Sequence, residues 1–294
     1  MTLAKQIAQF IEYLEVERNC AQTTIRNYQS YLARFQKWAS LEGIRTLELL
    51  TLKDSEKYRK WLTTQGGKTG FKKNTFNYHL IALRSLLKYA RKKSIHTIHP
   101  EKIFLTHSPA RSIAILSVKE IESLLTAPLL CDAPAIIKKR DVSILAILAH
   151  TGITVSELSR LKRKDFTHKL SITIQGRKNK YRSAHISAMT KDCLTSYLGA
   201  RIDSHDPLFI RHDRAFHSHS ADKNNSSLFL TPRSIQRIVQ KYAIMKGLGK
   251  TITPHTLRHS YAAHLLAKGI DIESVRSRMG HTNVATTQAY SNLT

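Results

Sequence analysis

Four polar side chains in the last forty residues are of types that suit chemistry on a phosphodiester. They are His255, Arg258, His281 and Tyr290. The first two lie three positions apart, directly after Thr253 and Pro254. Threonine is a good helix N-cap and proline suits the first helical position, so His255 and Arg258 are expected on one face of the first turn of a helix. Helix N-termini attract phosphate, so this segment predicts an anion site.

Three short helices are expected to position these four residues. Periodic apolar residues predict a helix that starts at Pro254 and continues to Gly269. A second helix is expected over residues 271–280, where aspartate precedes it and glycine ends it. A third helix, beginning near Thr282, carries Tyr290. Helices of this length can converge on one anion.

A tyrosine phenol is a suitable nucleophile for an enzyme that cuts DNA without water, because the phosphotyrosyl adduct preserves the energy of the phosphoester. Cationic or hydrogen-bonding donors must then stabilise the phosphorane, and His255, Arg258 and His281 are suited to this. A single histidine is more often a structural residue with local hydrogen bonds. Four such residues in this order favour catalysis.

The order and spacing of these residues resemble the tyrosine recombinase, or phage integrase, family. The pattern is H-x-x-R at His255 and Arg258, G-H ending 23 positions after the arginine, and tyrosine nine positions later. Upstream segments are similar to Xer-like members over nearly the whole chain. Residues 10–18, 23–28 and 31–35 resemble the opening helices of the core-binding domain of that family, and residues 83–89 resemble its last helix.

The resemblance implies a mainly α-helical fold with a small antiparallel sheet, arranged as a two-domain clamp on duplex DNA. A helical core-binding domain is expected over residues 1–105, a linker over 106–115, and a mixed α+β catalytic domain over 116–294. Further protomers are expected to assemble on paired DNA sites. The chemistry needs no ATP, cofactor or metal, because the phosphotyrosyl linkage conserves the energy.

The resemblance also implies a role for each of the four residues. Tyr290 would attack the scissile phosphate, leaving a 3′-phosphotyrosyl link and a free 5′-hydroxyl, and the hydroxyl of a partner strand would reseal the exchanged strand. Arg258 and His281 would stabilise the phosphorane, and His255 would assist proton transfer or orient the phosphate.

Two segments depart from the family pattern. Thr154 stands where the family has its first catalytic arginine, and threonine offers no fixed cationic fork to a phosphate. In residues 176–182, Arg177 occupies the position of the family's lysine. Arginine is a poor general acid, so Lys178 beside it is the candidate for protonating the leaving hydroxyl. The alternative is a basic hairpin, including Arg177 and Lys180, that binds the DNA backbone.

Thr154 leaves two classes of function open: a site-specific recombinase or integrase, and a DNA-binding relative with weak or no catalytic activity. The other four residues favour the enzyme, since a chain without catalysis has no chemical need of all of them. We expect slow cleavage unless Arg160, Arg163 or Arg177 replaces the missing arginine. A metal-dependent nuclease or transposase is disfavoured, because the sequence has no convincing carboxylate or Cys/His cluster.

The charge balance independently indicates a polyanionic partner. The chain has 47 Lys and Arg against 21 Asp and Glu, a net charge of +26, which suits nucleic acid. The excess is spread over both halves, so both domains are expected to contact DNA. In a predicted helix over residues 77–93, one row of leucines should pack inward, and the next row should face either DNA phosphates or solvent. The leucines are Leu80, Leu83 and Leu87, and the basic row is Arg84, Lys88 and Arg91.

Other features place the chain in the cytoplasm, with no membrane and no small-molecule substrate expected. Residues 1–17 form an amphipathic helical pattern and not a signal peptide, and no apolar run is long enough to span a bilayer. The three cysteines lie far apart, which disfavours both a disulfide framework and a zinc site. Histidines in residues 211–227 are interpreted as part of a solvated loop and not as a metal site.

Local signals also predict how the second domain begins. Ser117 and Glu120 are expected to form a capping box at its first helix. Helical patterns follow over residues 120–125 and 142–150, and strand-like runs over 170–175 and 184–187. A small sheet among helices is therefore expected.

Overall fold

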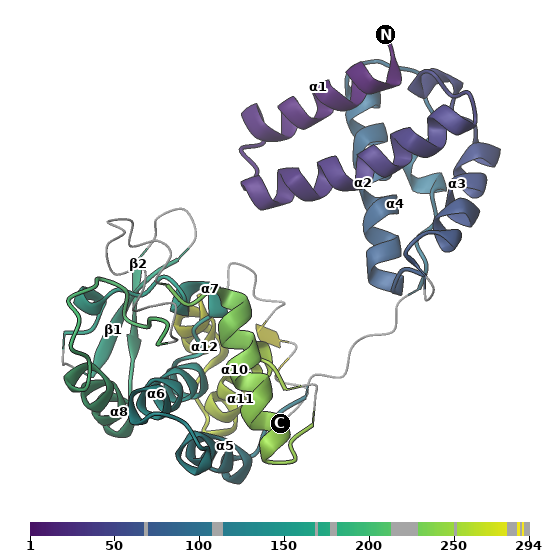
Figure 1. Cartoon of the computed structure of the whole chain (residues 1–294). Coiled ribbons are helices and arrows are strands. Elements are labelled where there is room, and N and C mark those ends of the chain that lie inside the picture. Colours follow the sequence, from purple (N-terminus) through teal and green to yellow (C-terminus); the bar gives the residue numbers. More distant parts are fainter. Residues whose placement is uncertain are drawn as a thin grey trace. The chain divides into compact units, whose positions relative to one another are not determined.

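The computed structural model describes residues 1–67, 70–107, 114–167, 170–176, 181–212, 229–249, 252–280, 287–288 and 290. The chain divides into two units, Met1–Arg111 and Ser112–Thr294 (Figure 1). The described residues are mainly helical, and they include a two-stranded antiparallel sheet, as the sequence predicts. None of the helices in these ranges combines the length and the apolar composition that crossing a bilayer requires.

The first unit is a set of helices packed around an aromatic core. Tyr58 lies between Phe35 and Trp38, with ring centroids 5.1 Å from each, and all three side chains are buried. Aromatic rings bury large apolar areas, so this cluster contributes much of the stability of the unit. The helices are α1 (Leu3–Val16), α2 (Gln22–Leu41), α3 (Leu52–Thr64) and α4 (Lys73–Lys92), with short 3-10 turns η1 (Leu47–Leu49) and η3 (Pro100–Lys102).

Helix α4 carries the row of leucines that the sequence predicts on its packed side. Leu80, Leu83 and Leu87 are fully buried, which confirms that prediction. The helix begins at Lys73, four residues earlier than predicted. Gly70, with a φ of +65°, is the last residue before α4 with a left-handed backbone. No such residue lies between Lys73 and the predicted start at Asn77, so the helix can begin earlier.

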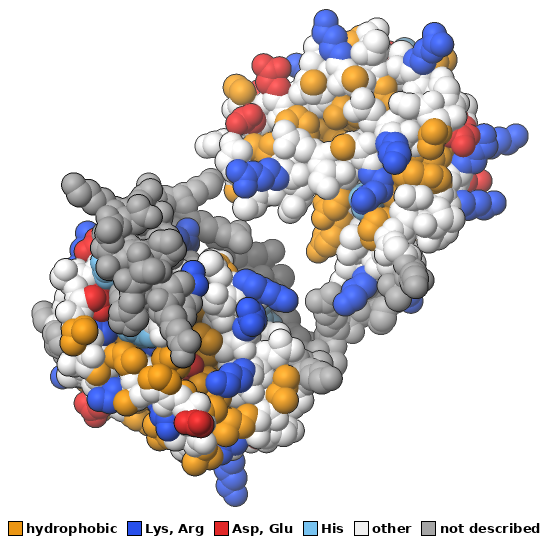
Figure 2. Space-filling model, in the orientation of Figure 1, with side chains coloured by type: hydrophobic (Ala, Val, Ile, Leu, Met, Phe, Trp, Pro, Cys, Tyr) orange, Lys and Arg blue, Asp and Glu red, His pale blue; other side chains and the backbone are white. Residues whose placement is uncertain are grey.

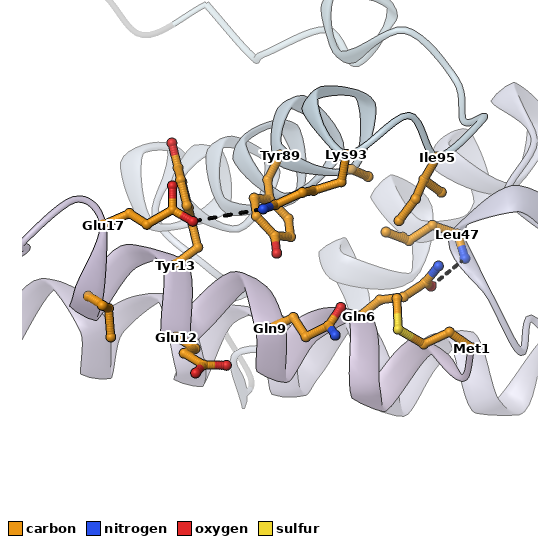
Figure 3. A pocket seen from close by; sticks show the side chains of 12 residues that line it. Met1, Gln6, Gln9, Glu12, Tyr13, Glu17, Leu47, Tyr89, Lys93 and Ile95 are labelled. Carbon is orange, nitrogen blue, oxygen red and sulfur yellow. Dashed lines mark hydrogen bonds and ion pairs between the residues drawn. The ribbon is translucent and has the colours of Figure 1, made fainter.

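A surface cavity of about 560 Å³ lies in this unit between α1 and α4 (Figure 3). Glu17 and Lys93 form an ion pair of 3.8 Å across it, and the Gln6 side chain accepts a 2.9 Å hydrogen bond from the Leu47 backbone N–H. The Gln6 contact fixes the 3-10 turn η1 against α1. The side chains that line the cavity include none of the residues predicted to be catalytic.

The segment predicted as the linker is anchored on each side. The Asn77 side chain on α4 makes hydrogen bonds of 2.7 and 2.9 Å to the backbone of Thr106, which holds that residue to the first unit. The backbone N–H of Leu116 donates a 2.8 Å hydrogen bond to the Ser260 hydroxyl in the second unit. Residues 108–113 of the predicted linker lie outside the described residues.

The second unit is organised around helix α6 (Ala135–Thr151). Its residues from Ile144 to Leu148 are fully buried, as expected for a helix that other elements surround. Helices α5, α8, α10 and α11 contact it. The helices around α6, with the neighbouring short elements, are α5 (Val118–Thr126), η4 (Ala127–Leu130), α7 (Val155–Leu158), η5 (Arg163–Asp165), α8 (Ala188–Gly199), α10 (Pro232–Met245), α11 (Pro254–Ala267) and α12 (Ile272–Met279).

The capping box predicted at the start of this unit is confirmed. Both the backbone N–H and the hydroxyl of Ser117 donate to the Glu120 carboxylate, at 2.7 and 2.8 Å. Strand β1 (Ser171–Gln175) lies within its predicted range and pairs with β2 (Tyr181–His185). The second strand was predicted over residues 184–187, and only 184 and 185 of these lie in β2. Ser187 instead caps α8, where its hydroxyl accepts a 3.2 Å hydrogen bond from the Thr190 N–H.

The helices predicted near the chemistry are present where the structure describes them. Thr253 caps α11, which ends at Ala267, because Gly269 with a φ of +77° terminates the helix just beyond. Helix α12 lies between the Asp271 cap and Gly280, as predicted. Tyr290 is helical, but residues 281–286, including the predicted start of its helix, lie outside the described residues.

Candidate active site

The buried guanidinium of Arg258 joins three segments of the second unit. Arg258 lies in the first turn of α11 and is 6% exposed. One of its nitrogens, Nη1, donates to the carbonyl of Gly152 at the end of α6, and Nη2 donates to the carbonyl of Met279 at the end of α12, at 2.6 Å. A guanidinium carries five N–H groups. These two bonds therefore fix its plane without using all its donors.

Arg258 is cationic in this environment. Burial lowers the pKa of its guanidinium, and the charge of Glu157 opposes the shift. Arginine nevertheless stays protonated inside proteins. The C-terminal carbonyls of two helices supply partial negative charge to it. A charged and rigidly held donor of this kind is what a pentavalent phosphorane requires.

Tyr290 is buried beside Arg258, and its hydroxyl contacts a histidine. The side chain is 2% exposed and packs in a cluster with Ala262, Val275 and Met279. Its hydroxyl lies 2.8 Å from Nδ1 of His259. Burial raises the pKa of the Tyr290 phenol, and the charge of Arg258 opposes this. The phenol is therefore protonated at neutral pH.

His259 was not predicted as a site residue. It follows Arg258 directly and lies four residues after His255, so a second histidine in the first turns of the helix was the available sequence signal. Burial lowers its pKa, and the charges of His255 and Arg258 lower it further. The imidazole is neutral at pH 7.

His255 lies at the surface above this pair. Its side chain is exposed, and its ring centroid is 6.4 Å from that of His259 in a stacked arrangement. The structure thus brings together His255, Arg258 and Tyr290 of the predicted set, with His259 between them. His281, Lys178, Arg177 and Lys180 lie outside the described residues, and their roles stay predictions.

Thr154 caps helix α7. Its hydroxyl oxygen accepts from the Glu157 N–H at 3.3 Å, and its own N–H and hydroxyl both donate to the Glu157 carboxylate at 2.8 Å. The hydroxyl proton is therefore donated to Glu157 and is not available to a phosphate. Thr154 supplies no cation to the site.

Arg182 of strand β2 is a second guanidinium close to Arg258, and the sequence analysis missed it. It binds Glu157 through both terminal nitrogens, at 2.5 and 3.1 Å, and its side chain is 17% exposed. A Cβ added to Gly280 would lie 3.3 Å from its central carbon. Arg182 therefore lies against the residue that follows Met279, whose carbonyl binds Arg258.

The Glu157 carboxylate is ionised in this arrangement. Burial raises its pKa, but hydrogen bonds from Arg182 and Thr154 outweigh burial and hold the pKa below its usual value. The Nε of Arg182 is buried and has no hydrogen-bond partner among the described residues. Arg182 thus keeps a donor that its pairing with Glu157 does not use.

The other arginines considered as substitutes for the missing one are placed differently. The Arg163 side chain binds the backbone carbonyl of Asp203 at 2.5 Å and its carboxylate at 3.2 Å. Arg160 is exposed on the surface. Arg177 lies outside the described residues. Of the described arginines considered for this role, Arg182 is the one that lies against Gly280, next to the Met279 carbonyl that binds Arg258.

The basic row predicted on α4 lies away from its buried leucines. Arg84 is half-buried, and Lys88 and Arg91 are exposed. Arg91 also donates a 3.4 Å hydrogen bond to the carbonyl of Thr97. Figure 2 shows Lys and Arg side chains on the visible face of both units. Contact of this row with DNA stays a prediction.

Comparisons with known proteins cover nearly the whole chain. A model described as "Phage integrase family" matches residues 114–294, and one described as "Phage integrase, N-terminal SAM-like domain" matches residues 7–94. Tyrosine recombinase XerC of Syntrophus aciditrophicus strain SB is 32% identical over 97% of this chain and 91% of its own length. Tyrosine recombinase XerD of Chlorobaculum tepidum is 27% identical over 98% of this chain and 92% of its own length.

Solved structures share the fold. XerH site-specific recombinase bound to a palindromic difH substrate, in a post-cleavage complex, has a TM-score of 0.72 at 22% identity, over 98% of this chain and 81% of that one. A lambda integrase dimer bound to a COC′ core site has a TM-score of 0.70 at 19% identity, over 99% and 77%. At these identities the likeness concerns the fold alone.

Replacing Gly152 with alanine is expected to destabilise the second unit. Gly152 has a φ of +61°, and an added Cβ would lie 2.6 Å from the Met279 sulfur and 2.7 Å from a Tyr261 ring carbon. Left-handed backbone and overpacking together should lower the free energy of unfolding by about 3 kcal/mol. Urea unfolding followed by far-ultraviolet circular dichroism measures this loss. Tryptophan fluorescence would not report on the second unit, because both tryptophans lie in the first.

Gly269→Ala is the matched control for this variant. Gly269 has a φ of +77° but nothing within 4 Å of an added Cβ, so about 1 kcal/mol of backbone strain is expected. Equal losses of stability in the two variants would contradict the close packing around Gly152.

Proposed function

The chain belongs to the phage integrase family of tyrosine recombinases, and we propose that it cleaves and rejoins duplex DNA at specific sites through Tyr290. The observation that carries this proposal is the buried Tyr290 hydroxyl, held 2.8 Å from His259, the residue next to Arg258. A nucleophile, a neutral base and a fixed cation are the components that phosphoryl transfer to a tyrosine requires.

In the proposed reaction, the Tyr290 oxygen attacks the scissile phosphorus. A 3′-phosphotyrosyl bond forms, and the 5′ oxygen leaves as a hydroxyl. Arg258 donates to the equatorial oxygens of the phosphorane, a role that its two carbonyl bonds favour by holding it in place. His281 assists Arg258, and Lys178 or His255 protonates the leaving oxygen. Attack by the hydroxyl of a partner strand completes the exchange.

The substrate is duplex DNA, bound by both units of the chain. The net charge of +26 and the basic row Arg84, Lys88 and Arg91 support this role. Further protomers assemble on paired sites, as the DNA-bound dimer of lambda integrase illustrates for a protein of the same fold. Because the XerC and XerD relatives come from bacteria, whose DNA is cytoplasmic, we propose that the protein acts in the cytoplasm.

Tyr290 must become accessible when DNA binds. At 2% exposure the side chain is shielded from solvent. Access of a phosphate to its hydroxyl is therefore part of the proposed cycle. Cleavage should require the DNA-bound state for this reason.

A DNA-binding protein without catalysis is the second candidate, and the observation that favours it is the capping role of Thr154. Arg182 is the described residue that best offsets this loss, because its guanidinium lies against Gly280 and its Nε has no hydrogen-bond partner in the described part of the chain. Its bonds to Glu157 would have to loosen for it to reach a phosphate.

Covalent trapping on a nicked suicide substrate tests the nucleophile. The adduct should survive denaturation, persist in chelator and disappear in Tyr290→Phe, because only a phenolic oxygen can form the link. Tyr181→Phe is the control, since it removes a hydroxyl from a side chain that is 66% exposed. An adduct that chelator abolishes, or that the Tyr290 variant retains, would point to other chemistry.

Replacing Thr154 with arginine is expected to speed cleavage. A bidentate cation at this position would stabilise the transition state by about 3 kcal/mol, which corresponds to about a hundredfold gain in the rate of phosphotyrosyl formation. Thr154→Lys supplies a point charge without the fork and should gain less. Single-turnover rates at saturating DNA measure the difference.

Two results would contradict this expectation. Rapid cleavage by the natural chain with no gain in Thr154→Arg would show that another cation compensates, and Arg182→Lys would then lose activity. No cleavage by either protein on a verified binding site would favour the non-catalytic candidate.

A further inference from the structure

His259 makes a direct contact with the proposed reacting atom. Its Nδ1 lies 2.8 Å from the Tyr290 hydroxyl, with the two ring centroids 5.3 Å apart. Of the predicted residues that the structure describes, none occupies this position, and His255 is exposed on the same helix. The proposed nucleophile is therefore in direct contact with an imidazole.

The surroundings of His259 keep its imidazole neutral. Burial lowers its pKa, and the charges facing it come from His255 and Arg258 on its own helix. Tyr290 faces it from the carboxyl-terminal segment. Arg258 is in turn coupled to Glu157 on α7 and Arg182 on β2, so the local charge includes one carboxylate and two guanidiniums. An unprotonated imidazole nitrogen can accept a proton at pH 7.

We propose that His259 is the general base that takes the phenolic proton of Tyr290 as the tyrosine attacks the phosphate. The inference rests on the function proposed above and assigns its first proton transfer. Nδ1 is the acceptor, so Nε2 carries the hydrogen of the neutral ring. His255, at the surface, is left to act on the phosphate or the leaving group.

The step balances as follows. The Tyr290 O–H bond breaks, its proton moves to Nδ1 of His259, and the electron pair on the phenolic oxygen forms the bond to phosphorus. The P–O5′ bond breaks, and the 5′ oxygen leaves with the electron pair of that bond and takes a proton from Lys178 or His255. During rejoining, the incoming 5′-hydroxyl returns its proton to that same residue and displaces the phenolic oxygen, which recovers its proton from His259.

The proton moves together with the bond to phosphorus and not before it. Burial raises the pKa of Tyr290 and lowers that of His259, so a separated phenolate and imidazolium are disfavoured in the chain without DNA. Bond formation removes charge from the phenolic oxygen. The buried contact therefore keeps the tyrosine protonated until a phosphate is in place.

The test is the pH dependence of phosphotyrosyl formation in His259→Gln. Glutamine can keep a hydrogen bond to the hydroxyl but cannot take its proton. For the natural chain, the rate should rise with pH through the lowered pKa of His259 and be level above about pH 6.5. In His259→Gln it should fall by about a hundredfold or more at pH 7. It should then rise with hydroxide concentration in the alkaline range.

His264→Gln is the matched control, because His264 lies on the same helix five residues further along and is half-buried. It should cleave at the natural rate. A merely structural role for His259 would lower the rate equally at all pH values. Alkaline recovery in His259→Gln therefore separates a base from a packing residue.

A second measurement does not depend on activity. Nitrogen NMR of the histidine side chains should show Nδ1 of His259 unprotonated at pH 7. A protonated Nδ1 would overturn the proposal, because the ring would then donate to Tyr290.

The outcomes distinguish this inference from the proposed function. If the natural chain and His259→Gln form the adduct at the same rate with the same pH profile, only the role of His259 is overturned. If the natural chain binds its site and forms no adduct at any pH, the proposed function fails, and the inference fails with it.

Discussion

The candidate site depends on one buried interaction, the bonds from the Arg258 guanidinium to the carbonyls of Gly152 and Met279. Helix ends leave carbonyls unpaired, and a buried cation needs such partners. The Arg258 side chain therefore supplies hydrogen-bond donors to the carbonyls at two helix ends, and these bonds hold it rigid. Gly152 and Gly280, both with positive φ, end those two helices and let the chain turn past the guanidinium. Stability and catalysis share this contact.

The same burial explains why Tyr290, the proposed nucleophile, requires a base. An apolar cluster that holds Tyr290 in place also disfavours its ionisation, so a base must be built into the cluster. In the proposed mechanism His259 is that base, and its neutral ring adds no charge to the cluster. The two hydrogen bonds from Arg182 to Glu157 hold a second guanidinium close to Arg258, whereas Thr154 supplies no cation. A site of this kind holds its catalytic groups ready while it keeps the phenol protonated in the absence of DNA.

Local signals in the sequence predicted the elements well. Caps such as Thr253 and Asp271 act over three or four residues, so their helices were predicted close to where the structure has them. The second strand was misplaced, because Ser187 serves the helix that follows. Arg182 and Glu157 were missed for a different reason. Their pairing joins segments 25 residues apart, and a sequence pattern does not show which distant side chains meet.

The most direct test of this account is the rate of phosphotyrosyl formation in Arg258→Lys at saturating DNA. A single ammonium cannot bind both carbonyls and also present a planar fork to the phosphate. The account predicts at least about a hundredfold slower cleavage, with DNA affinity close to that of the natural chain. Cleavage at the natural rate in this variant would contradict it.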